Sequence, residues 1–240
     1  MTPDLYIGCA GWTLGRSKES FPAEGSVLQR YATVFNSVEI TSSFYRSHKL
    51  ATYERWASTV PEHFRFSVKL PKEITHERRF ADSEAPLDSF LGEIAALGGK
   101  LACILVQTRP KMELDAPVAS SFFEMLRTKY SGAVVVEPRN ASWFTEEAGR
   151  LFDDCGLSRV ATDPTTIPGA DEPGGSRSAI YYRLHGSPQM YYSAYTDSYL
   201  DDLAGRIRTH AVENHPVWCI FDNTISGAAT ANALYLRQNL

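Results

Sequence analysis

Short apolar and β-branched runs alternate with longer segments of helical periodicity along the whole chain. This alternation predicts strands over residues 5–11, 37–43, 65–70, 101–107, 133–138, 158–163, 179–185 and 217–222. It predicts helices over residues 25–35, 51–59, 87–98, 117–130, 144–155, 198–213 and 227–238. Residues 164–178 contain three prolines and three glycines, so we expect an irregular loop there in place of a helix.

A strand followed by a helix, repeated in this way, is typical of a parallel sheet. No linker-like or low-complexity segment interrupts the repeats. We therefore expect residues 1–240 to form a single domain, an α/β fold of the TIM-like (β/α)8 barrel type. Its strands would be parallel, and a loop would replace the sixth helix. A doubly wound open sheet is the alternative architecture.

One face of the predicted strands becomes polar toward the C-terminal end of nearly every strand. Alternate residues of a strand point to opposite sides, and the other set is almost wholly apolar, as expected where helices cover a sheet. Barrel enzymes build their active sites at the C-terminal ends of the strands. The polar set comprises Glu39, Lys69, Gln107, Glu137, Arg139, Asp163, Arg183, His185 and Asn223.

Composition narrows the classes of function. The 240 residues are 43% hydrophobic and 22% charged, which fits a globular protein and argues against disorder. A net charge of −4 gives nucleic acid no general attraction. The apolar runs are far shorter than the roughly 20 residues that cross a bilayer. The N-terminal residues show no signal-peptide pattern and the cysteines form no CxxC pair, so we expect a cytoplasmic, reduced protein with no membrane partner.

A series of short motifs runs through the chain in one order. They are Gly8-Cys9-Ala10-Gly11-Trp12, Val38-Glu39-Ile40, Phe44-Tyr45-Arg46, Lys69 to His76, Gln107, Glu137-x-Arg139-x-x-Ser142-Trp143, Asp163, Tyr182-Arg183-Leu184-His185-Gly186, Asn223, Gly227-Ala228 and Asn232-Ala233. Together they resemble the YecE-like family, a domain of unknown function. The resemblance implies a TIM-like barrel and a cytoplasmic bacterial-type protein, and it implies no established reaction.

Three positions depart from that family pattern. Thr41 and Asp222 stand where the family has asparagine, and Thr108-Arg109-Pro110 replaces a Leu-Pro-Pro run. Roles that depend on those asparagines therefore do not transfer to this chain.

The charged members of the polar set are candidates for acid–base chemistry. The predicted catalytic residues are Glu39, Lys69, Glu137, Asp163 and His185. Lys69, Arg139 and Arg183 would hold an anionic group, while a carboxylate and His185 exchange protons with the substrate. Glu137 and His185 are the preferred pair. The alternative is an ion-pair network that only fills the barrel.

Aromatic and polar residues near the predicted strand ends could contact a ligand. The predicted binding residues are Trp12, Tyr45, His76, Gln107, Arg139, Trp143, Arg183, Tyr195, Asn223, Gly227, Ala228 and Asn232. The start of the last predicted helix, at Gly227 and Ala228, would expose backbone amides to the anionic group of a substrate.

Three classes of function remain open from sequence. The preferred one is an enzyme that applies general acid–base chemistry to a small anionic, phosphate- or sugar-like molecule, without a cofactor. The second is a metal-dependent phosphodiesterase or endonuclease, with Glu137, Asp163 and His185 as ligands of a divalent ion. The third is a non-catalytic module that binds a nucleotide, a sugar or RNA. Nucleic acid is the less favoured partner, because the chain is acidic.

Overall fold

The computed structural model describes residues 4–213 and 215–240, and its strands form two sheets. The first sheet has the order β1 (Leu5–Cys9), β10 (Val217–Phe221), β9 (Ile180–Leu184) and β7 (Ala161–Asp163). The second has the order β2 (Ser37–Ile40), β3 (Arg65–Lys69), β4 (Leu101–Gln107), β5 (Ala133–Glu137), β6 (Ser158–Arg159) and β8 (Gly174–Gly175). All paired strands are parallel except β6 and β8.

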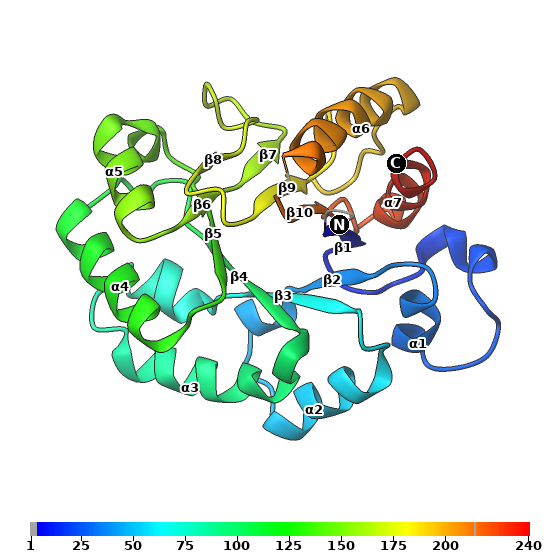
Figure 1. The fold of residues 1–240 in the computed structure, drawn as a ribbon, viewed down its shortest axis with the longest axis horizontal. Helices are drawn as coiled ribbons and strands as arrows, with labels where there is room; N and C mark the ends of the chain where they lie inside the picture. The colour runs from blue at the N-terminus through cyan, green and yellow to red at the C-terminus, as the bar shows by residue number, and fades with distance from the viewer. Residues whose placement is uncertain (1–3, 214) are drawn as a thin grey trace.

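Helices lie around the outside of the strands (Figure 1). They are α1 (Val27–Ala32), α2 (Leu50–Thr59), α3 (Glu84–Ile94), α4 (Ala116–Lys129), α5 (Glu146–Asp154), α6 (Asp197–Val212) and α7 (Ala228–Gln238). Local sequence explains several starts. The side chain of Asp115 accepts a hydrogen bond from Val118 N at the start of α4, and Ser26 and Gln29 form a reciprocal capping box at α1.

The predicted α/β fold with mostly parallel strands is confirmed. Between β7 and β9, in residues 164–179, the structure contains no helix, as the prolines and glycines predicted. This segment contains one element that the sequence did not predict, the short strand β8, which pairs antiparallel with β6. In Figure 1, β8 and its loop lie between α5 and α6.

A small hydrophobic cluster lies between the two sheets, separate from the larger core under the helices. Tyr181 of β9 stacks on Trp218 of β10 in this cluster, with ring centroids 5.9 Å apart. Its buried members are Ala10, Cys103, Leu105, Val135, Val160, Ala179, Tyr181, Trp218 and Ile220. They precede polar residues on the same strand faces, so the cluster forms an apolar floor beneath the strand ends.

Two contacts connect the sheets. A parallel bridge joins Ala10 to Glu39, where Gly11 N donates to Glu39 O at 2.9 Å, and it links the end of β1 to β2. Gly8 allows this approach, because a Cβ there would lie 2.2 Å from the carbonyl oxygen of Ser37. On the other side, β6 and β7 belong to one extended run, interrupted only at Val160.

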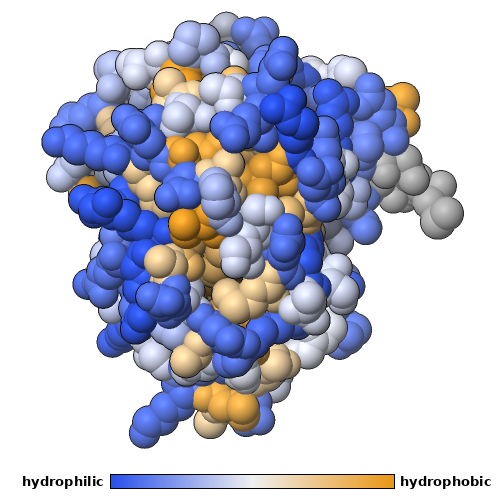
Figure 2. All heavy atoms as spheres, turned by 90° about the vertical axis from the view of Figure 1, so that its left-hand side faces the viewer, coloured by the Kyte–Doolittle hydropathy of each residue, from blue (hydrophilic) through white to orange (hydrophobic). Residues whose placement is uncertain are grey.

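Figure 2 shows the face on the left of Figure 1, where α4 and α5 lie. Apolar atoms gather near the centre of this face, and hydrophilic atoms surround them. Among the described residues, none of the helices has the length and apolar character that crossing a membrane requires.

Candidate active site

Arg183 is the centre of a buried set of ion pairs at the C-terminal ends of the strands. It extends from β9 and is 1% exposed. Its Nε and Nη2 donate to Glu39 of β2 at 3.1 and 2.8 Å, and its Nη1 donates to Glu137 of β5 at 3.1 Å. Nη2 also lies 2.9 Å from Oδ2 of Asp222, which follows β10. Three carboxylates from three strands thus share one guanidinium, whose planar donors suit such pairing.

His185 and Arg139 meet this set at Glu137. Arg139 forms an ion pair with Glu137. Nε2 of His185 lies 3.0 Å from Oε1 of Glu137 and 2.7 Å from Nη2 of Arg139. With a proton, this nitrogen donates to the carboxylate, and without one it accepts from the guanidinium. We call Glu39, Glu137, Arg139, Arg183, His185 and Asp222 the ion-pair cluster.

Two of the carboxylates are held in the ionised form. Burial alone would raise the pKa of Glu137, but Arg139, Arg183 and His185 outweigh it and keep the pKa well below the usual range. Burial likewise raises the pKa of Asp222, and Arg183 and His185 lower it further than burial raises it. Glu137 and Asp222 therefore stay charged at neutral pH.

The members of the ion-pair cluster differ in how far their side chains are exposed to solvent. Glu137 and His185 are 0% exposed, so the preferred acid–base pair lies beneath the surface and does not reach a ligand in this structure. The side chains of Arg139 and Asp222 are 13% and 14% exposed. These two residues, rather than Glu137 and His185, bring the cluster to solvent.

Lys69 stands beside the cluster without a partner. It ends β3, is 8% exposed, and makes no ion pair or side-chain hydrogen bond with any described residue. Its Nζ lies 4.1 Å from the centre of the Phe44 ring. Burial and the neighbouring Arg183 lower the pKa of Lys69 to about 8, although Glu39, Glu137 and Asp222 oppose that shift. A lysine with this pKa can exchange a proton near neutral pH.

His76, which the sequence offered as a binding residue, lies in the same part of the structure as Lys69. Its ring packs edge-on against Phe44, with centroids 4.9 Å apart, and Nδ1 lies 2.8 Å from the hydroxyl of Thr75. Burial, Lys69 and Arg109 lower the pKa of His76. Arg109 Nη1 also lies 3.4 Å from the carbonyl oxygen of His76. The loops after β3 and β4 thus add an imidazole beside Lys69 and a guanidinium beside His76.

Tyr191 is a residue of this site that was not among the predicted site residues. Its ring packs edge-on against His185 at 5.5 Å, and its backbone has φ = +69°, which is rare for a bulky residue. Burial raises the pKa of its phenol, with Arg139 and Asp222 among the charges that act on it. The run of tyrosines from 191 to 199 was the available signal, but it did not indicate which of them faces the cluster.

The predicted faces of the sixth and eighth strands were wrong. The hydroxyl of Thr162, not Asp163, points to the cluster and lies 3.4 Å from Glu137 Oε1. Asp222, not Asn223, pairs with Arg183. The apolar Trp218 and Ile220 occupy the same face as Asp222, because the space between the sheets needs an apolar floor. Apolar character therefore did not mark the helix-facing side in these strands.

Asn223, Asn232 and Tyr195 form a buried scaffold rather than an open ligand site. Asn223 Nδ2 donates to Ser193 O and to Asn232 Oδ1, each at 2.9 Å. Asn232 Oδ1 accepts from Tyr195 N at 3.1 Å. The Tyr195 hydroxyl donates to the backbone oxygen of Asp163 at 3.0 Å. These contacts tie the loop after β9 to α7.

Gly227 and Ala228 lie where loops pack closely. Gly227 N donates to Thr224 O at 3.1 Å, and a Cβ on Gly15 would lie 3.0 Å from Gly227 O. Ser226 Oγ donates to Tyr192 O. A loop contact therefore uses the Gly227 amide at the corner where the sequence predicted an anion, and Gly227, with φ = +79°, permits the close approach.

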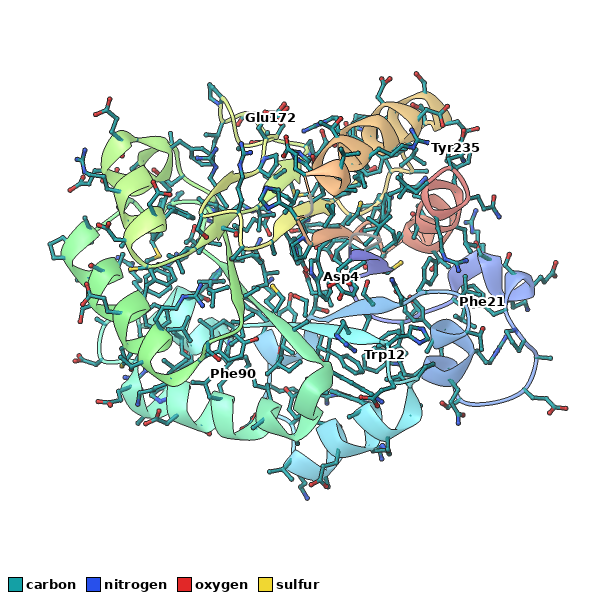
Figure 3. All side chains as sticks on the ribbon, viewed as in Figure 1. Asp4, Trp12, Phe21, Phe90, Glu172 and Tyr235 are labelled. Carbon is teal, nitrogen blue, oxygen red and sulfur yellow. The ribbon has the colours of Figure 1, made fainter. Side chains whose placement is uncertain are left out.

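The two predicted tryptophans have different environments. Trp143 is 0% exposed, and its Nε1 donates to Met112 O at 3.0 Å, so it belongs to the core rather than to a binding surface. Trp12, labelled in Figure 3, is partly exposed. Its ring packs edge-on against Trp56 of α2, with centroids 5.0 Å apart.

Two hollows adjoin the site. One, of about 420 Å³, is bordered by Arg139 and Thr162 and by several prolines. The other, of about 380 Å³, is lined by Phe44 and the exposed Tyr45. Gln107 ends β4 opposite Glu137 in the sheet register and is partly exposed. A ligand above the cluster would therefore have room to extend toward Arg139.

The ligand set predicted for a divalent metal does not assemble. Asp163 lies on the opposite strand face from Glu137, with its backbone oxygen bonded to His185 N at 2.7 Å. Within residues 4–213 and 215–240, no three His, Cys, Asp or Glu side chains are grouped to hold a metal ion. Arginines instead bind the carboxylates that a cation would need.

Comparisons place the chain among proteins of similar fold and sequence. YunF of Bacillus subtilis strain 168, a UPF0759 protein, is 23% identical and the alignment covers 98% of this chain and 94% of YunF. YecE of Escherichia coli K12, also a UPF0759 protein, is 24% identical over 69% of this chain and 61% of YecE. A crystal structure of a DUF72 family protein of Enterococcus faecalis V583 superposes with a TM-score of 0.83 at 21% identity, covering 98% and 95% of the two chains.

The match to a family model decides the relationship. The model described as "Protein of unknown function DUF72" matches residues 6–240, which includes every residue of the ion-pair cluster and Lys69. The motifs that resemble the YecE-like family lie within this range. This chain therefore belongs to the DUF72 family, whose function is unknown.

Proposed function

We propose that the protein is an enzyme that uses general acid–base catalysis on a small anionic, phosphate- or sugar-like substrate at the C-terminal ends of its strands. One observation carries the proposal, namely the nearly buried and unpaired amine of Lys69 beside a charged cluster. An unpaired buried cation is costly, and structures retain such groups mainly where they serve a function.

The residues have different roles in this proposal. Lys69 and Arg139 bind the anionic group, because both are cationic donors and both reach solvent. Lys69 also exchanges protons with the substrate, since its pKa of about 8 lies near neutral pH. His185 and Glu137 act from beneath as positioning residues, because both are buried and both contact the guanidinium of Arg139.

The hollow beside Arg139 and Thr162 supplies space for the rest of the substrate. Its proline-rich wall suits a small, partly apolar body such as a sugar ring or a short carbon chain. The metal-dependent alternative lacks its predicted ligands. A binding module without catalysis remains an outcome of the test below.

We also infer that the two sheets form one closed TIM-like (β/α)8 barrel as a single domain. The bridge from Ala10 to Glu39 supports closure on one side, and the continuous run through β6 and β7 supports it on the other. The hydrophobic cluster shared by both sheets supports a common interior.

Binding of small anions tests the function. Isothermal titration with inorganic phosphate, sugar phosphates and small carboxylic acids should identify a ligand, and Lys69→Met should weaken its binding by about tenfold or more, as expected for loss of a charge-assisted contact. Lys72→Met is the matched control, because Lys72 is exposed and pairs with Glu77. Equal affinities for the two variants, or no ligand in the whole panel, would contradict the proposal. Turnover of the ligand identified distinguishes an enzyme from a binding module.

A further inference from the structure

We propose that Lys69 forms an imine with a carbonyl group of the substrate, so that the substrates are small anionic aldehydes or ketones. This inference rests on the proposed function, because it assigns a covalent step to the same lysine. It goes further by naming the reactive group of the substrate and the atom that attacks it.

The surrounding carboxylates leave the amine free. Three of the other six lysines pair with acids, among them Lys72 with Glu77 at 3.2 Å and Lys129 with Asp88 at 2.6 Å. Near Lys69, Glu39 and Glu137 are already held by Arg183. No carboxylate oxygen of the described residues lies within 4.0 Å of the Lys69 amine. Nζ is therefore free to approach a bound carbonyl carbon.

The environment also favours the neutral amine that such a reaction needs. Burial and the positive charge of Arg183 oppose protonation of Lys69, and Glu39, Glu137 and Asp222 favour it, with a net lowering of the pKa to about 8. At neutral pH the fraction of neutral amine is thus on the order of 100-fold larger than for an ordinary lysine. An amine activated in this way is the usual nucleophile for a carbonyl group.

The step balances without any additional reactant. Nζ bonds to the carbonyl carbon, and one proton of the amine moves to the carbonyl oxygen, which gives a carbinolamine. An acid then donates a second proton to that oxygen, the C–O bond breaks, and water leaves. The product is a C=N iminium that retains one N–H. His76 packs on the same Phe44 ring as Lys69, and its lowered pKa favours the neutral imidazole at pH 7. It can therefore accept the proton that the Lys69 ammonium loses and return it to the oxygen as the second proton.

Two guanidinium groups can hold the anionic part of such a substrate. Arg109 lies next to His76, and Arg139 lies at the exposed edge of the ion-pair cluster. Guanidinium forks bind carboxylate and phosphate equally well. The substrate class is therefore a 2-oxo acid or a phosphorylated aldehyde or ketone, and two probes distinguish the two.

Reductive trapping tests the imine directly. The full-length protein is incubated at pH 7 with pyruvate or with glyceraldehyde 3-phosphate, reduced with cyanoborohydride, and digested for peptide mass mapping. We expect Lys69 to carry the reduced adduct at least about tenfold more than any of the other six lysines, because its amine is unpaired beside the cluster and its pKa is lowered to about 8. The rate of labelling should rise through the pKa of Lys69 near 8.

Variants separate this inference from the proposed function. Lys69→Arg keeps the positive charge and removes the nucleophile, so it should retain phosphate binding and lose the adduct. Lys72→Arg should keep both. Labelling spread evenly over exposed lysines, or an unlabelled Lys69 with both probes, overturns the imine. If phosphate still binds in a Lys69-dependent manner in that case, the proposed function stands alone. If it does not, both fail.

Discussion

Lys69 carries a positive charge in a place where burial opposes it. A pKa lowered from 10.5 to about 8 means that the folded state disfavours the ammonium by about 3 kcal/mol. Nothing in the packing of β3 requires this charge. Lys69 therefore lowers the free energy of unfolding, as functional residues commonly do.

Lys69→Met should therefore stabilise the protein. Between pH 8 and 10.5 the unfolded chain binds more protons at this site than the folded chain, so the cost of Lys69 is complete below pH 8 and disappears as the pH rises to 10.5. We expect the variant to gain about 2–3 kcal/mol in the free energy of unfolding at pH 7 and almost nothing at pH 10.5. Urea unfolding at both pH values measures this, and a destabilised variant at pH 7 would contradict it.

Glu137 has the opposite effect on stability. Its pKa lies well below the usual range because Arg139 and Arg183 outweigh the effect of burial. Glu137→Gln leaves the buried guanidinium of Arg183 and the partly exposed one of Arg139 short of a partner, and it should cost about 3 kcal/mol at pH 7. A carboxyl with a lowered pKa stabilises the fold above its unfolded pKa of about 4.5 and loses that effect at lower pH. The deficit should therefore shrink below pH 4.5, and a deficit independent of pH would point to steric damage instead.

At the scale of elements, α7 holds the loop that follows β9. Asn232 of α7 bonds to Tyr195 and to Asn223, and it is 6% exposed. The same loop carries Tyr191 to the ion-pair cluster. Packing of one helix thus determines the position of a phenol that belongs to the site.

Asn232→Ala should loosen this loop. Loss of its hydrogen bonds leaves the backbone of Tyr195 unpaired, at an expected cost of about 1–3 kcal/mol. Amide hydrogen exchange should accelerate in residues 187–196 and remain unchanged in β3 and β5. Gln238→Ala, on the exposed end of the same helix, is the control. Protection unchanged in both variants would mean that the loop is held by other contacts.

At the scale of the molecule, Gly8 decides how closely β1 approaches β2. A Cβ at this position would lie 2.2 Å from Ser37 O and 2.9 Å from the hydroxyl of Tyr31. If the sheets form one closed barrel, this approach is needed, and Gly8→Ala should cost at least about 2 kcal/mol by forcing the strands apart. Gly149→Ala in α5 has open space and a helical backbone, so it should be neutral or slightly stabilising. Thermal unfolding of the two variants decides between a closed and an open arrangement.

The order of strands and helices could be predicted from the sequence alone. Every predicted helix has a counterpart within a few residues, and so does the loop in place of the sixth helix. Periodicity and caps such as Ser26 and Asp115 act over a few residues, so they can be recognised from the sequence alone. Glu39, Glu137, Arg139, Arg183 and His185 were predicted to gather, and the structure brings them together.

Only the tertiary structure decided which face of a strand is inside and which charged group meets solvent. Alternation offers two faces and does not name one, so the polar Asp163 and Asn223 were chosen although Thr162 and Asp222 face the cluster. Glu137 and His185 are buried, and the Lys69 amine lacks an ion-pair partner among the described residues. Both results depend on arginines and tyrosines that are distant in the sequence. Local sequence determines where strands begin and end, whereas burial and pairing are sums over neighbours that only folding brings together.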